Sequence, residues 1–219
     1  MRCGGAVPRE SQDAWQSAGS TSSSPLVVAP LTPERWCDLE ALFGPRGACG
    51  GCWCMWWRLS SAQFERDKGE GNRQALWAIV RSGEIPGLLA YRDERPVGWC
   101  AVAPRESFPR LKRSRVLKRV DDQPVWSVVC FFVARAYRGQ GVMEELLRAA
   151  LRHASDQGAT IVEGYPVEPK TPRLPDAFAY VGLASVFRKV GFAEVARRSE
   201  TRPIMRYVVP PRTEAQECR

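Results

Sequence analysis

The chain has 219 residues, of which 44% are hydrophobic and 26% charged, a balance typical of a globular protein with one domain. No apolar run approaches the roughly 18 residues that a membrane span requires, and the first residues lack the apolar stretch of a secretory signal, so we expect a cytoplasmic protein with no membrane partner. The formal net charge of +8 favours an anionic partner, such as a phosphorylated cofactor or nucleic acid.

The first half of the chain predicts helices and a hairpin between flexible ends. Residues 1–24 are rich in Gly, Ser, Thr and Gln and predict a disordered leader, as 211–219 predict a tail, which leaves a domain at 25–210. Residues 26–28 predict a first strand. Residues 32–44, TPERWCDLEALFG, predict a helix capped by Thr32 and ended by Gly44, and 72–81 predict a second helix. Residues 87–103 predict a hairpin that turns at Asp93 and Glu94.

The second half predicts a strand, a helix and a parallel strand in succession. Residues 125–133, VWSVVCFFV, are nearly all apolar, as in a central strand that is covered on both faces. The next helix carries one apolar stripe and ends at Gly158, and 159–165 predict the following strand, which completes a βαβ unit. A helix at 183–192 and two closing strands complete an α/β fold, a mixed sheet with helices on both faces.

Two glycines, Gly139 and Gly141, stand directly before the helix of the βαβ unit, in the segment AYRGQGVMEELL. A helix start offers unpaired N–H groups and a partial positive charge, and glycine lets the backbone come close to a ligand. Together these features suit a bound phosphate. The spacing alone favours a structural turn, because it fits neither the P-loop nor the dinucleotide-binding pattern.

The longer stretch VVCFFVARAYRGQGVMEELLRAAL resembles the acetyl-CoA motif of the GNAT acyltransferase superfamily, Gln/Arg-x-x-Gly-x-Gly/Ala after a central strand. Arg138, Gly141 and Met143 stand at its three defined positions. The segment VFRKVGF at 186–192 resembles the later motif, in which a short helix ends in Gly-Phe. The resemblance extends from about residue 26 to 209 and implies a GNAT-like fold whose central βαβ unit binds acyl-CoA.

The resemblance implies an N-acetyltransferase that moves an acetyl group from acetyl-CoA to a primary amine of a small molecule by direct attack. One set of residues would bind the CoA pyrophosphate through backbone N–H groups: Arg138, Gly139, Gln140, Gly141, Val142 and Met143. The strand edge at Phe131, Phe132 and Val133 would pair with the pantetheine arm, and one N–H there would stabilise the oxyanion, a contribution often worth about 3 kcal/mol. Many superfamily members pair through edge strands, so a homodimer is one assembly to consider.

Two residues depart from the pattern of the superfamily. Met143 stands where the motif has a small residue, and we expect its side chain to pack into the core. Phe187 stands where many members have the tyrosine that protonates the departing thiolate, and phenylalanine has no proton to give. This departure keeps open a second hypothesis, a non-catalytic protein of the same fold that binds acyl-CoA as a sensor.

Proton transfer therefore needs other candidates. Glu163 lies in an apolar strand, where burial would disfavour its charged form and make it a usable general base. The alternative for Glu163 is an exposed carboxylate or one paired with an arginine. Tyr165 and Tyr180 are the candidate acids, with packing in the core as the alternative for each.

The segment CGGCWCMWWR at 49–58 is rich in cysteine and tryptophan. Its three cysteines and the upstream Cys37 could together hold zinc, but the spacing is not a common zinc pattern, so we favour buried thiols and no metal. Tryptophan faces attract cationic amines and shape apolar slots. Trp53 and Trp56 are therefore candidate contacts for the acceptor, with packing against the sheet as the alternative.

Residues 105–119 form a basic segment with seven Lys or Arg residues and one Glu. It could meet the CoA phosphates or an anionic acceptor, and it would repel a polycationic acceptor. Combined with a zinc-binding Cys/Trp segment it would suit a nucleic-acid-binding module, which is the least favoured of the three hypotheses.

Overall fold

The computed structural model describes residues 24–169 and 180–211, so that the predicted leader and tail lie almost entirely outside the described residues. The strands are β1 (Val27–Pro30), β2 (Gly87–Arg92), β3 (Arg95–Pro104), β4 (Trp126–Val133), β5 (Ile161–Gly164), β6 (Ala193–Arg197) and β7 (Pro203–Val208). The α-helices are α1 (Trp36–Phe43), α2 (Ser61–Arg66), α3 (Glu70–Arg81), α4 (Pro109–Arg113), α5 (Val142–Asp156) and α6 (Ala184–Val190). None of the helices in these ranges is long and apolar enough to cross a membrane.

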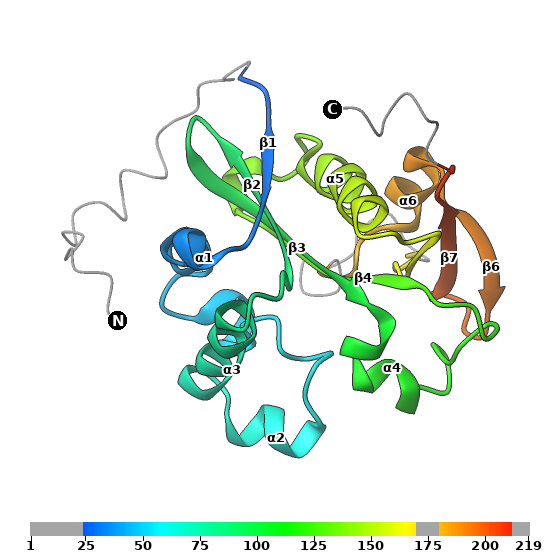
Figure 1. Cartoon of the computed structure of the whole chain (residues 1–219), viewed down its shortest axis with the longest axis horizontal. Helices are drawn as coiled ribbons and strands as arrows, with labels where there is room; N and C mark the ends of the chain where they lie inside the picture. Colours follow the sequence, from blue (N-terminus) through cyan, green and yellow to red (C-terminus); the bar gives the residue numbers. More distant parts are fainter. Residues whose placement is uncertain (1–23, 170–179, 212–219) are drawn as a thin grey trace.

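Seven strands form one mixed sheet in the order β1-β2-β3-β4-β5-β7-β6. β4 and β5 are parallel, as a βαβ unit requires, and the other neighbours are antiparallel. Figure 1 shows α1 and α3 on one side of this sheet and α5 and α6 on the other. The prediction of an α/β mixed sheet with helices on both faces is confirmed.

Each face of the sheet has its own apolar core. On the first face, which we call the tryptophan face, α1, the 47–59 segment and α3 bury Trp36, Trp53 and Trp57 against Trp99 of β3. On the opposite face, α5 and α6 pack Leu146, Leu147 and Phe187 against the sheet. β4 contributes alternate side chains to both cores, which explains why its sequence is apolar throughout.

The residues of the predicted turns and helix ends explain most of the agreement between the predicted and the observed elements. Asp93 and Glu94 both have positive φ, 49° and 62°, the geometry of a type I′ hairpin turn between β2 and β3. Gly44 and Gly191 follow the last residues of α1 and α6. Two details differ from the prediction: α1 begins after a 3-10 turn and the Thr32 side chain makes no capping hydrogen bond, and the short helices α2 and α4 were not foreseen.

β4 and β5 separate at the middle of the sheet. They pair only from Trp126 to Val128, opposite 162–164, while β4 continues to Val133 beside β3. A bulge opposite the step from Ala101 to Val102 leaves Val129 as the extra residue of β4. Beyond Gly164 the chain pairs instead with 182–184, where the Val167 N–H donates to the Gly182 carbonyl at 2.9 Å. The 129–133 part of β4 therefore presents a backbone edge to the opening between the two strands.

Replacing Gly164 with alanine is expected to destabilise the fold by about 1–3 kcal/mol, the usual cost of overpacking a core. The added methyl group would overlap the Phe187 ring, which fills the α6 side of the opening and lies edge-on to Phe131 at 6.2 Å. Urea unfolding measures the effect. A leucine at position 187 is smaller than phenylalanine and leaves room for the added methyl group. The double variant Gly164→Ala, Phe187→Leu should therefore lose less free energy of unfolding than the two single variants added together. Strictly additive losses would contradict this account.

Candidate active site

The turn before α5 forms an open backbone cradle, which we define as residues 138–143. Gly139 and Gly141 have left-handed φ angles of 72° and 79°, and a Cβ atom at either would meet no other atom within 4 Å. The backbone bond that starts α5 runs from the Glu145 N–H to the Gly141 carbonyl at 3.1 Å. The N–H groups of Val142 and Met143 consequently have no acceptor inside the helix. Open space beside such N–H groups at a helix start suits a phosphate.

Side chains hold the cradle in shape. Arg138 donates from Nε to the Val133 carbonyl at 3.1 Å and so ties the turn to the end of β4. Gln140 donates to the Ala136 carbonyl at 2.8 Å and accepts from Arg92 of β2 at 2.5 Å. Residues 138–141 are exposed on the surface, so these bonds leave the backbone accessible to a ligand.

The first side chains of α5 leave the cradle free. Val142 is buried and Met143 is half-buried against the α5–α6 core, as the sequence predicts for Met143. Glu144 binds Lys189 of α6 at 2.7 Å and Arg148 at 3.0 Å, and these hydrogen bonds, first the one from Lys189, lower the pKa of Glu144. Its negative charge is thus compensated by two cations on the side of α6.

The open edge of β4 lies next to the cradle. Gly98 of β3 pairs with Val133, and a Cβ atom at Gly98 would touch Val142 and Leu146, so the end of β4 and the start of α5 lie together. The side chains of Phe131 and Val133 face the α5–α6 core, while Phe132 packs on Phe43 at 5.5 Å on the tryptophan face. The backbone between them is left to form the rim of the opening.

Glu163 lies in a buried ion-pair cluster beside this opening. Its side chain is 1% exposed. Oε1 accepts from Arg105 at 2.9 Å and from the Tyr165 hydroxyl at 2.6 Å, and Oε2 accepts from Arg206 at 2.8 Å. Arg206 also binds Asp121 through two bonds of 2.6 and 3.0 Å. Both carboxylate oxygens are therefore occupied by donors, which favours the alternative of a carboxylate paired with arginine, and we do not retain Glu163 as the general base.

Tyr165 belongs to the same cluster. Its hydroxyl contacts Arg105, Glu163 and Ser127, the last at 2.9 Å. Burial, and next the negative charge of Glu163, raise the pKa of Tyr165 well above its usual value. Since the hydroxyl already donates to Glu163, the geometry favours a structural role for Tyr165 over that of the acid expected from the sequence.

The sequence matches one known protein family over the part of the chain that contains the cradle. The family model described as the acetyltransferase (GNAT) family matches residues 53–170, which is more than half of the chain. The chain belongs to the GNAT acetyltransferase family. The matched range includes the cradle, the open edge of β4 and the 53–58 part of the Cys/Trp segment.

Solved GNAT structures share this fold at low sequence identity. A GNAT-family acetyltransferase from Streptococcus agalactiae 2603 is 11% identical with a TM-score of 0.52, and the match covers 85% of this chain and 96% of that one. An N-acetyltransferase from Staphylococcus aureus Mu50 is 10% identical with a TM-score of 0.50, covering 85% of this chain and 100% of that one. Comparison with curated proteins gave no match. The likeness to these structures concerns the fold alone.

The two candidate tryptophans of this GNAT chain have different surroundings. Trp53 is 6% exposed, with a strained φ of 42°, and packs between Trp36 at 6.1 Å and Phe43 at 5.6 Å. This position favours core packing over contact with an acceptor. Trp56 is 37% exposed, but the Arg110 guanidinium stacks on its ring at 3.6 Å. The face of Trp56 that was expected to receive a cationic amine is therefore already covered by a cation.

Tyr180, the second candidate acid of the sequence, gathers with several cysteines on the tryptophan face of β4. Tyr180 lies close enough to Cys130 of β4 and to Cys52 for their charges to influence it, and burial raises the pKa of Tyr180 above its usual value. The buried Cys54 accepts from Trp99 Nε1 at 3.1 Å. A hydrogen bond from Cys130 lowers the pKa of Cys54. The sequence indicated Tyr180 and the cysteine-rich segment separately, and it gave no signal for Cys130 of β4 as a neighbour of both.

The Cys/Trp segment and the basic segment meet where Arg110 stacks on Trp56. Among residues 24–169 and 180–211, no group of three or more His, Cys, Asp or Glu side chains is arranged to hold a metal ion. The basic segment begins at the end of β3, whereas the cradle lies beside its start, so the two occupy opposite ends of the sheet. The residues of the basic segment also differ in burial. Arg105 is buried in the ion-pair cluster, whereas Arg113 and Arg115 are exposed.

Proposed function

We propose that this GNAT protein is an N-acetyltransferase that transfers the acetyl group of acetyl-CoA to a primary amine of a small molecule by direct attack. The observation that carries the proposal is the continuity of two features: the open cradle at residues 138–143 leads directly to the edge of β4 at 129–133, which has no partner strand in the described part of the chain. Family membership supports acyl transfer in general, and the choice of acetyl-CoA and of an amine is the proposal.

The cradle fits a pyrophosphate by its own geometry. A Cβ atom at Gly139 or Gly141 would stand in open space, which leaves room for a ligand against the backbone. The N–H groups of residues 138–143 would hold the phosphate oxygens of CoA, and the edge at Phe131, Phe132 and Val133 would hold the pantetheine arm. Bound acetyl-CoA supplies an acyl group activated as a thioester.

The open edge of β4 is suited to stabilise the reacting carbonyl. An N–H on this edge that points into the opening can donate to the oxygen on which negative charge develops, and the Phe187 and Phe131 rings keep water from the α6 side. One such donor typically contributes about 3 kcal/mol to lowering the barrier. The acceptor would approach from the tryptophan face, because the opposite face is filled by α5 and α6.

Tyr180 is the group that we propose as the proton donor to the departing thiolate. It lies just before the 182–184 segment that borders the opening, and a Cβ atom at Gly182 would stand 3.0 Å from the Phe131 ring. Burial raises the pKa of Tyr180, so the phenol keeps its proton in the neutral range and has one to give. Phe187 is fully buried among aromatic rings and takes no part in proton transfer.

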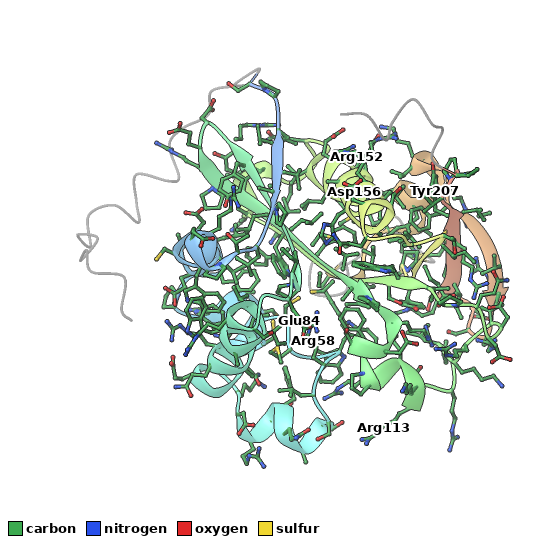
Figure 2. All side chains as sticks on the ribbon, viewed as in Figure 1. Arg58, Glu84, Arg113, Arg152, Asp156 and Tyr207 are labelled. Carbon is green, nitrogen blue, oxygen red and sulfur yellow. The ribbon has the colours of Figure 1, made fainter. Side chains whose placement is uncertain are left out.

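Replacing Tyr180 with phenylalanine is expected to lower kcat about 100-fold, at the low end of the range for general acid–base catalysis. Because the folded pKa is raised, loss of the proton should reduce wild-type activity only as pH rises beyond the ordinary tyrosine range, near about 10. Stopped assays across pH 6–10 measure the change in kcat, and wild-type activity should show no loss from deprotonation of Tyr180 within this range. Tyr207→Phe on β7, whose ring packs on Phe192 at the far side of the sheet, is the control that should change nothing (Figure 2). An unaltered kcat in the Tyr180 variant would remove this residue from the mechanism.

A non-catalytic acyl-CoA-binding protein is the second candidate, and Phe187 favours it because it replaces the usual acid. One experiment separates the two functions. Calorimetric titration with acetyl-CoA tests binding, and release of free CoA thiol in the presence of primary amines tests transfer. Binding with amine-dependent thiol release supports the transferase. Binding without release across a broad set of amines supports the sensor, and no binding by folded protein rejects both.

A further inference from the structure

Four buried N–H donors on the tryptophan face have no acceptor among the residues that the structure describes. They are Trp57 Nε1, Arg58 Nη2, Arg110 Nη2 and Arg202 Nε. Buried donors without partners cost free energy, and native proteins leave few of them. Three of the four belong to guanidinium groups, which stay charged in proteins. Donors of this kind suit an anion if they lie together.

Three of these residues lie where the 57–59 segment contacts residues 108–110. The Arg110 backbone N–H donates to the Trp57 carbonyl at 3.4 Å, and Arg110 Nε donates to the Leu59 carbonyl at 2.9 Å. The Arg58 guanidinium lies over the Phe108 ring at 4.8 Å, two residues before Arg110. Each arginine is thus held by the other segment: Arg58 by Phe108 just before α4, and Arg110 by the 57–59 segment.

Tyr180 connects the fourth residue to this group and to the proposed reaction centre. Its hydroxyl accepts a hydrogen bond from Arg202, and its charge state is sensitive to Arg110 and to Cys130 of β4. Cys130 belongs to the open edge of β4. The unpartnered guanidinium groups are therefore neighbours of the residue that we place beside the thioester.

The charge of this group is not balanced nearby. Burial is the first cause of a lowered pKa at Arg58, Arg110 and Arg202. The acidic neighbours are the Cys54 thiol and then Glu84 for Arg58, Glu65 and then the Tyr180 hydroxyl for Arg110, and the Tyr180 hydroxyl for Arg202; the two glutamates are exposed. No ion pair in the described ranges joins either glutamate to these arginines, although Figure 2 shows Glu84 beside Arg58 near the centre of the molecule.

We infer that these donors bind an anionic group of the acceptor, so that the substrate is a small amine that also carries a carboxylate or a phosphate. The inference rests on the proposed acetyl transfer, whose acceptor site it specifies. A guanidinium fork matches both anions through two parallel hydrogen bonds. The CoA phosphates already have a proposed site of their own in the cradle at residues 138–143, so these donors are left for the acceptor. A polycationic acceptor would be repelled, and a neutral amine would leave the donors unpaired.

Matched pairs of amines test the inference in two ways. Each pair shares the amine and differs in the anion: an α-amino acid against its decarboxylated amine, and phosphoethanolamine against ethanolamine. We expect kcat/KM to be at least about tenfold higher for one kind of anionic member, since one charge-assisted hydrogen bond is worth about a factor of ten or more. The same member should raise the melting temperature of the protein, a readout that does not need catalysis. The preferred pair distinguishes carboxylate from phosphate.

Two variants and one control make the test specific. Arg110→Gln and Arg202→Gln should each reduce the preference and the thermal shift, and either variant suffices if the other fails to fold. Arg113→Gln removes the same charge from the exposed end of α4, at the periphery of the molecule in Figure 2, and should leave both unchanged. Equal rates for both members of every pair, or no thermal shift by any anionic amine, would overturn the inference. Failure to bind acetyl-CoA would instead reject the proposed function, while the thermal shift still decides on the anion site.

Discussion

Replacing Glu163 with glutamine is expected to lower the free energy of unfolding by about 3–5 kcal/mol, the usual result of removing one partner from a buried ion pair. Glu163, Arg105 and Arg206 have almost no exposed side-chain surface, and the carboxylate binds both guanidinium groups. A neutral amide would leave two buried cations facing Asp121 alone, and Asp121 contacts only Arg206 of the two in the described structure. Urea unfolding followed by fluorescence measures the loss.

The control is Glu194→Gln, which removes a carboxylate from an exposed ion pair with Arg197 on β6. Exposed pairs contribute about 0–1 kcal/mol, so this variant should unfold almost as the wild type does. The two roles of Glu163 predict opposite patterns. A general base would leave stability nearly unchanged in the Gln variant and lower kcat by about 10²–10⁴-fold. That pattern would contradict the structural role and restore Glu163 to the mechanism.

The fold could be predicted from the sequence wherever the signal was local. The apolar run of β4, the stripe of α5 and the turn residues Asp93 and Glu94 each report their own surroundings, because periodicity and φ preference act over a few residues. The cradle was predictable for the same reason. A glycine with left-handed φ before an amphipathic helix is a local feature, and Gly141 has this geometry. The short helices α2 and α4 lack a full apolar stripe and gave no such signal.

The candidate site was less predictable because its chemistry depends on partners far along the chain. Glu163 meets Arg105 from 58 residues before it and Arg206 from 43 residues after it. In the sequence, Arg105 is one member of a basic segment, and nothing there separates it from the exposed Arg113. The tryptophans pose the same problem: Trp53 and Trp56 are three residues apart, yet one packs in the core and the other stacks under Arg110.

The proposed reaction uses two separate sets of donors. The cradle sits where β4 ends, held by Arg138 and Arg92. Of the unpartnered donors, Arg110 belongs to α4 and contacts the 57–59 segment, while Arg202 neighbours Tyr180 beside the open edge of β4. The CoA phosphates and the anion of the acceptor would then each meet their own donors on the two sides of the thioester.

Replacing Gly141 with valine is expected to weaken acetyl-CoA binding at least about a hundredfold, since each charge-assisted hydrogen bond to the cradle contributes about 1.5–3 kcal/mol and about 1.4 kcal/mol is a factor of ten in affinity. Gly141 has a φ of 79°, and the space next to its Cα is open. A branched side chain would occupy that space and strain the turn that presents the N–H groups. Calorimetric titration of the folded variant measures the affinity.

Gly158 provides a closely matched control at the other end of α5. Its φ is 81°, and a Cβ atom there would also meet nothing within 4 Å, so Gly158→Val introduces the same backbone strain into the same helix. Both variants should therefore lose similar stability, and only the Gly141 variant should lose affinity. Wild-type affinity in both variants would mean that the cradle does not bind the cofactor, whereas equal losses in both would trace the effect to strain. A loss confined to Gly141→Val would assign the pyrophosphate to the start of α5, because no other difference separates the two substitutions.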